Sequence, residues 1–256
     1  MLALPGISGR NHVKSRSPRS RLGPAIGVSI LLSVTSPKLA LSDSSRPPEP
    51  GAPITELGAP TPESGAPTTE SSAPTRVVDA LHENLISVMK DAKTLGYDGR
   101  FEQLEPVINE LFDIPFMAEK SIGRHWKTVD EENRAHLLAT FERFTVANYA
   151  GRFTGYSGQF FETLKEQASR HGTVLVYSRL NLENGETVQL NYRLRPAKDD
   201  GWKIIDVLLN GTVSELALRR SEYSSLIQRE GFAALMSAIN KRIDDLAGGN
   251  VPDQPS

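Results

Sequence analysis

Hydrophobic positions after residue 75 recur at intervals of three and four residues, the spacing of an amphipathic helix. The first apolar stripe comprises Val78, Leu81, Leu85, Val88, Met89, Ala92 and Leu95. It predicts a helix that ends at Gly96, because glycine often follows the last helical turn. A short second helix is expected next, with Pro106 in its first turn, where proline is tolerated.

Two further helices are predicted before the pattern changes. Asp113 is placed to cap a helix that begins near Pro115 and ends at Gly123. A longer helix follows, opened by a capping box from Thr128 to Glu131. Its apolar stripe comprises Leu138, Phe141, Thr145, Tyr149 and Phe153. The first half of the folded region is therefore expected to be helical.

From Phe161 onward the hydrophobic period changes to two, which is the alternation of β-strands. The predicted strands cover residues 161–168, 173–182, 187–195 and 202–209. The turn sequences ENG and KDDG join the last three strands as an antiparallel meander. Apolar residues alternate with polar ones along the third strand, so one of its faces is expected to meet water.

The fourth strand is apolar on both faces, with Asp206 as the exception. Both faces therefore need a cover. The closing helices, predicted over residues 214–229 and 231–246, can supply one cover, and the earlier helices or a bound apolar ligand the other. The pattern as a whole predicts an α+β fold, with a curved antiparallel sheet of about four strands packed against helices from both ends of the domain.

The first closing helix carries two adjacent arginines near its apolar stripe. Arg220 lies in line with Leu216 and Tyr223, so its guanidinium starts from the packed side of the helix. Arg219 has easier access to water. We predict that Arg220 forms a structural ion pair with Asp206, because a carboxylate among apolar neighbours needs a partner. Arg219 is then available to a ligand phosphate, an acidic partner or solvent.

Composition narrows the possible chemistry. The chain has 256 residues, a net charge of −2 and no cysteine. Near-neutral charge without a long basic run argues against nucleic acid as a partner. The lack of cysteine excludes disulfides, thiolate catalysis and cysteine-ligated metals. Four histidines, His82, His125, His136 and His171, lack ligand spacing and are interpreted as surface or capping residues. No metal site, cofactor or catalytic residue is assigned.

Residues 1–42 resemble an export signal. A basic stretch precedes the apolar run IGVSILLSV, and small residues follow in LALS, with processing expected close to Ser42. The apolar run is far shorter than the ~20 residues that a spanning helix needs. The alternative is an uncleaved tail.

Residues 43–75 form a polar, proline-rich segment with a seven-residue repeat, visible as GAPITEL, GAPTPES and GAPTTES. Proline in every repeat and the lack of an apolar seam exclude a coiled coil. We expect an extended, disordered linker. The folded domain is predicted over residues 76–247, and residues 248–256 as a flexible tail.

Four blocks of the sequence, taken together, resemble the MlaC or toluene-tolerance family. They are FDIPFMAEKSIGRHWK, FERFTVANYAGRFTGYSGQ, WKIIDV and VSELALRRSEYSSLIQREGFAAL. The form ELALRRSEY is most similar to the HpnM branch, which is associated with hopanoid biosynthesis. One departure is at residues 212–215, which read Thr-Val-Ser-Glu where the family usually has Gly-Val-Ser-Leu.

The resemblance implies a periplasmic, non-enzymatic lipid carrier with a cone-shaped fold related to that of nuclear transport factors. Its cargo would be a phospholipid or a hopanoid-type lipid, held in an apolar cavity between sheet and helices. The implied partners are lipid transport complexes of the inner and outer membranes, with the carrier itself a monomer. Arg219 becomes the candidate contact for a lipid head group or a partner. The expected cavity lining is Val146, Tyr149, Phe153, Phe160, Phe161, Val176, Tyr192, Val207, Leu209 and Tyr223.

Three alternatives remain open from the residues alone. The lining residues can be ordinary core, since most aromatic stripes are. Folds of this kind also host isomerases, for which Asp206 is the candidate base and Tyr192 the candidate hydrogen-bond donor. A third possibility is a scaffold that docks onto membrane complexes without binding lipid.

Overall fold

The computed structural model describes residues 73–198 and 201–249. The predicted export signal, most of the predicted linker and the tail from residue 250 lie outside the described residues. Helix α1 (Ala73–Lys90) begins three residues before the predicted start of the folded domain at residue 76. Pro74 lies in its first turn, where the missing N–H of proline removes no helical hydrogen bond.

The helix expected to end at Gly96 is interrupted earlier, at Asp91, and a second helix, α2 (Ala92–Leu111), follows directly. Gly96 adopts φ 62° and kinks α2 near its start. The expectation that Pro106 occupies a first turn is wrong, because Pro106 lies well inside α2. Gly96, whose backbone is not helical, does separate two helical stretches as predicted, but the second stretch begins directly after it, so Pro106 falls beyond the first turn.

Helix α3 (Ile114–Ile122) is capped as predicted, since the Asp113 carboxylate accepts the backbone N–H of Phe116. It ends at Gly123, where the short 3₁₀ segment η1 (Gly123–Lys127) begins. The predicted capping box of helix α4 (Glu131–Arg152) is wrong. Asp130, not Thr128, caps α4 by accepting the N–H of Asn133, whereas the Thr128 hydroxyl donates to the carbonyl of His125.

The sheet is antiparallel, with five strands in sequence order. The strands are β1 (Phe160–Ala168), β2 (Val174–Asn181), β3 (Thr187–Pro196), β4 (Trp202–Leu209) and the two-residue β5 (Val213–Ser214). A short 3₁₀ turn, η2 (Arg170–Gly172), joins β1 to β2. Apart from β5, these elements match the predicted strands to within one residue at each end.

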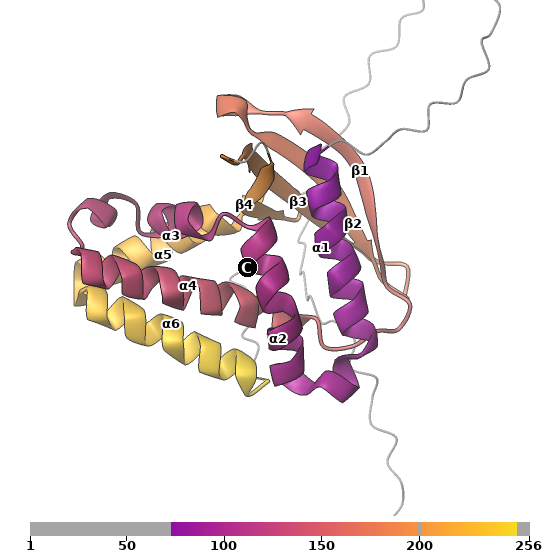
Figure 1. Cartoon of the computed structure of the whole chain (residues 1–256), viewed down its shortest axis with the longest axis horizontal. Coiled ribbons are helices and arrows are strands. Elements are labelled where there is room, and N and C mark those ends of the chain that lie inside the picture. Colours follow the sequence, from indigo (N-terminus) through magenta and orange to yellow (C-terminus); the bar gives the residue numbers. More distant parts are fainter. Residues whose placement is uncertain (1–72, 199–200, 250–256) are drawn as a thin grey trace, which may run out of the picture.

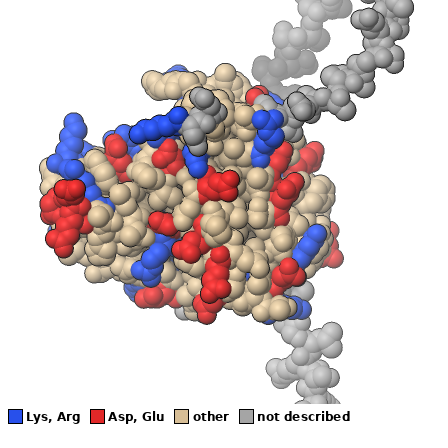
Figure 2. Space-filling model, viewed as in Figure 1, with Lys and Arg blue, Asp and Glu red and all other residues tan. Residues whose placement is uncertain are grey.

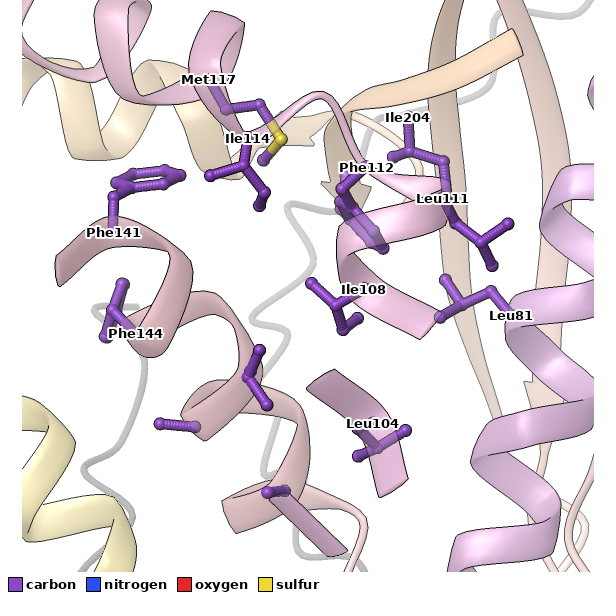
Figure 3. Packing of buried hydrophobic residues seen from close by; sticks show 14 of the residues in the cluster. Leu81, Leu104, Ile108, Leu111, Phe112, Ile114, Met117, Phe141, Phe144 and Ile204 are labelled. Carbon is purple, nitrogen blue, oxygen red and sulfur yellow. The ribbon is translucent and has the colours of Figure 1, made fainter. Parts of the chain in front are cut away.

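Helices α5 (Glu215–Glu230) and α6 (Phe232–Ala247) complete the domain, and Figure 1 shows its two halves. Helix α1 lies against the curved sheet, whereas α4 and α6 run side by side with α3 and α5. Strand β4 is covered from both sides as expected: Ile204 packs near Leu81 and Leu111 (Figure 3), while Asp206 bonds to the start of α5.

The free edge of β4 is protected by the connection between α2 and α3. Phe112 forms a parallel bridge with Ile204, and the N–H of Asp113 donates to the Ile204 carbonyl. Arg195 on β3 adds an ion pair to the Asp113 carboxylate, with 2.6 Å between Nη2 and Oδ2. Such cover removes the unpaired strand edge that promotes association.

The surface mixes both signs of charge. On the face in Figure 2, lysines and arginines are interspersed with aspartates and glutamates over most elements. Among the helices of the described residues, none combines the length and the apolar character needed to cross a membrane.

Candidate functional site

A layer of packed rings lies between the sheet and the helices. His82 of α1 stacks on Phe161 of β1, with ring centroids 4.0 Å apart and planes at 4°. Phe153 packs against Phe161 at 6.3 Å and against Tyr149 at 5.9 Å between centroids. The Tyr192 hydroxyl lies 3.2 Å from Nε2 of His82, at hydrogen-bond distance. We call these five residues the aromatic layer.

The interpretation of His82 as a surface or capping residue is wrong. Only 5% of this residue is exposed. It lies four residues after Val78 and three before Leu85, so it shares the buried face of α1. Burial lowers the pKa of His82 from 6.5 to about 3. His82 is therefore neutral at neutral pH, and its ring behaves as another packed aromatic.

The predicted lining residues divide by position. Four of them, Tyr149, Phe153, Phe161 and Tyr192, belong to the aromatic layer. Four more are buried in the same core and are Val146, Val176, Val207 and Tyr223. Leu209 is partly buried against that core, and Phe160 is 57% exposed on β1. Phe160 is exposed because it precedes Phe161 on an edge strand, and successive strand residues face opposite ways.

A cavity of about 280 Å³ lies among α4, α5 and α6. We call it the α4–α6 pocket. Its apolar wall consists of Phe144, Leu218, Tyr223, Leu226, Leu235 and Ile239. Its charged side chains are Arg152, Glu215, Arg219, Glu222 and Arg242. A pocket with one apolar wall and several guanidinium groups suits a ligand with an apolar body and a polar end.

Arg219 is part of this pocket and is largely buried. Its Nη2 lies 3.1 Å from Oε2 of Glu215, one helical turn earlier, and its side chain is 14% exposed. The guanidinium also lies over the Phe144 ring, 4.7 Å from the centroid. The position of Arg219 is thus fixed by an ion pair and a cation–π contact, which orients its remaining N–H groups.

Tyr149 of the aromatic layer lies within electrostatic reach of the pocket, although it is not among the residues that line it. Burial raises the pKa of the Tyr149 phenol well above 10, and Glu215, Arg219 and Arg152 of the pocket add smaller effects on that pKa. Burial also raises the pKa of Tyr192, and the charge of Glu215 raises it further. These couplings indicate that the charged side of the pocket is close to the rings of the layer.

The predicted ion pair between Asp206 and Arg220 is absent from the described residues. Asp206 instead accepts the Ser214 hydroxyl at 2.6 Å and the backbone N–H of Leu216 at 3.1 Å. Burial raises the pKa of Asp206, and these two hydrogen bonds oppose that shift. Arg220 is exposed and lies against Gly123. The stripe through Leu216 and Tyr223 misled the prediction, because α5 turns Arg219, not Arg220, toward α4 and α6.

A substitution at Gly123 separates the effect of backbone strain from that of the contact with Arg220. Its φ is +55°, and a Cβ built there would lie 2.8 Å from Nε of Arg220. We expect Gly123→Ala to lower the free energy of unfolding by about 1 to 3 kcal/mol, because side chains are strained at this φ. Chemical denaturation of the Gly123→Ala protein, alone and combined with Arg220→Ala, measures this. Full recovery in the combined variant would mean that steric contact, not backbone strain, causes the loss.

Asp206 and Tyr192 do not form the pair that the isomerase alternative requires. Tyr192 is paired across the sheet with Val207, and Arg193 with Asp206, so the two side chains lie on opposite faces. The Tyr192 hydroxyl meets His82 on one face, whereas Asp206 meets the start of α5 on the other. Within residues 73–198 and 201–249, no group of three acidic or histidine side chains is placed to hold a metal ion.

A model of the MlaC protein family matches residues 79–241, which include the aromatic layer and most of the pocket. The chain belongs to the MlaC family. A search of curated proteins finds no match to this MlaC-family chain.

Among solved structures, this MlaC-family protein is similar to a phospholipid-binding protein from Ralstonia solanacearum, whose structure was determined in complex with a phospholipid. The two are 22% identical with a TM-score of 0.60, and the match covers 69% of this chain and 99% of the other. The likeness confirms the predicted α+β fold.

Sequence reasoning missed Arg152 and Arg242 in the pocket of this MlaC-family protein. Arg152 ends α4 and stands beside Phe153, three residues after Tyr149. A basic residue in a last helical turn is usually explained by the helix dipole, so it gives no distinct signal. The position of Arg242 on α6 becomes informative only once α6 is known to pack against α4.

Proposed function

We propose that this protein is a periplasmic lipid carrier whose acyl cargo enters the α4–α6 pocket and extends toward the aromatic layer. The observation that carries the proposal is the combination of an apolar wall and fixed guanidinium groups in one cavity. Membership of the MlaC family supports it, as does the likeness to a phospholipid-binding protein. A carrier of this kind must shield its cargo, because each CH₂ exposed to water costs about 0.8 kcal/mol.

The size of the pocket bears on how a lipid is accommodated. Its volume of about 280 Å³ is just below the range of about 300 to 1,000 Å³ for small-molecule sites. A two-chain lipid therefore requires more room than the pocket offers. We propose that loading separates Phe153 from Phe161, whose ring centroids are 6.3 Å apart, and thereby opens a path between sheet and helices. The expected lining of Val146, Val176 and Val207 would then contact the second chain.

The cargo in this proposal is a phospholipid or a hopanoid-type lipid, the latter on the strength of the resemblance to the HpnM branch. The carrier is proposed to exchange that cargo, as a monomer, with lipid transport complexes of the inner and outer membranes. Family membership and fold both favour a binding protein over an enzyme. The opposite orientation of Asp206 and Tyr192 removes the specific reason for the isomerase alternative.

A matched pair of substitutions on α6 tests the use of the pocket. Ala238 and Ala233 are both exposed on α6, but only Ala238 lines the pocket. We expect Ala238→Trp to reduce lipid uptake from labelled phospholipid vesicles about tenfold or more, because the indole occupies the cavity, and a tenfold change corresponds to about 1.4 kcal/mol. Ala233→Trp should leave uptake unchanged. Equal uptake by both variants would place the cargo elsewhere.

A further inference from the structure

We propose that the α4–α6 pocket selects lipids whose polar end is anionic, with Arg152 as the residue that contacts the phosphate or carboxylate oxygen. This inference rests on the proposed function and adds a preference for charge to it. It concerns a carboxylate or a phosphate at one end of an acyl chain, two groups with the same oxygen acceptor chemistry.

The hydrogen bonds of Arg152 are incomplete. Its Nε donates to Oδ1 of Asn148 at 2.9 Å, which fixes the guanidinium at the pocket wall. Its Nη2 is buried and donates no hydrogen bond within the described residues. A buried N–H without an acceptor is unfavourable, and a ligand oxygen in the pocket would remove that deficit.

The balance of charge around Arg152 also favours an anion. The lining holds three arginines and two glutamates, which leaves one positive charge in excess. Glu215 is already paired with Arg219, at 3.1 Å. Arg242 forms no ion pair in the part of the chain that the structure describes. Burial is the main cause that lowers the pKa of Arg152; Glu215 raises that pKa, whereas the positive charges of Arg242 and Arg219 repel the guanidinium and lower it. An anion bound between Arg152 and Arg242 would offset this repulsion.

The same wall carries the apolar groups that an acyl chain needs. Phe144 lies beneath the Arg219 guanidinium, and Leu235 and Ile239 of α6 are buried beside it in the pocket. A small inorganic anion would leave this apolar wall unused. The geometry therefore favours an anionic amphiphile over free phosphate.

The preference can be measured with pairs of probes that share the same acyl or alkyl chains and differ in the net charge of the polar end. Binding to the wild-type protein is compared for oleate and oleyl alcohol, and for vesicles of phosphatidic acid and phosphatidylcholine with the same chains. We expect the charged member of each pair to bind at least tenfold more tightly. The oleate pair reports on a carboxylate and the vesicle pair on a phosphate, so the two arms identify which group is preferred. Inorganic phosphate up to millimolar concentration should not compete.

Variants assign the preference to the pocket. Arg152→Gln should bring the ratio of the affinity for the charged probe to that for the neutral probe close to one, without changing the affinity for the neutral probe. Arg152→Lys should retain part of the preference for the charged probe. Arg229→Gln, which changes a 63% exposed arginine on α5 outside the pocket, should leave the ratio unchanged. If Arg152→Gln does not fold, Arg242→Gln replaces it and should also lower the ratio.

Three results would overturn the inference. Equal binding of charged and neutral probes by the wild-type protein would leave the lipid carrier in place without charge selection. An equal loss of both probes in Arg152→Gln would make Arg152 a structural residue. Failure of every lipid probe to bind would overturn the proposed function together with the inference.

Discussion

The folded protein is expected to lose stability as the pH falls from about 6.5 to about 3, by up to about 1.4 kcal/mol per pH unit through His82 alone. Burial holds the pKa of His82 at about 3 in the folded state, whereas the unfolded chain has the ordinary value of 6.5. In this interval the unfolded state binds a proton that the folded state does not. Stability is therefore complete above pH 6.5 and decreases toward pH 3.

Other groups titrate in the same interval, so the measurement must be a difference. Burial raises the pKa of Asp206, which makes the folded state more stable as the pH falls through that range and opposes the effect of His82. Urea denaturation of the wild-type protein and His82→Gln from pH 7.5 to pH 4 isolates the histidine. The variant should lose less stability on acidification, while His136→Gln, at an exposed position of α4, should follow the wild type. Parallel curves for all three proteins would contradict this account of His82.

The second large effect is expected at Asp206. Asp206→Ala should lower the free energy of unfolding by about 3 kcal/mol, because hydrogen bonds to a charged group contribute about 1.5 to 3 kcal/mol each. The carboxylate accepts from the Ser214 hydroxyl and from the N–H of Leu216, one of the unpaired donors in the first turn of α5. Ser214 in turn caps α5 by accepting the N–H of Ala217. Loss of Asp206 thus removes the side-chain hydrogen bonds that join β4 to the start of α5.

Double-mutant cycles distinguish this arrangement from the ion pair that the sequence suggested. Arg220→Ala should cost less than about 1 kcal/mol, as for other exposed arginines. Asp206 and Ser214 should show coupling, whereas Asp206 and Arg220 should be additive. Strong coupling between Asp206 and Arg220 in thermal or chemical denaturation would contradict the hydrogen bonds described above.

The strands were predictable because their pattern is strict. A period of two with turn sequences between the runs leaves few alternatives, and one register flip would expose a whole apolar face. The bounds predicted for α5 and α6 are likewise correct to within one residue, because Ser214 and Gly231 mark where the two helices begin. The cap of α4 was not predictable, because Thr128 and Asp130 both satisfy the sequence rules for capping. Only the geometry of the folded chain selects between them.

The candidate site was less predictable, for a physical reason. A helical stripe gives the buried face of α5 only to within one residue, and that error was enough to exchange the positions predicted for Arg219 and Arg220. The position of α6 decides which one enters the pocket. The buried position of His82 did have a signal, its spacing from Val78 and Leu85, but histidine is found on surfaces often enough to hide it. No pattern in one segment reveals a pocket formed by three helices.

The central claim is that this protein carries lipid, and mass spectrometry of the organic extract from protein purified under native conditions tests it most directly. The account predicts close to one lipid per chain for the wild-type protein and for Ala233→Trp, and a large loss of that lipid for Ala238→Trp. Wild-type protein that is repeatedly free of lipid, and that takes up none from labelled vesicles, would contradict it.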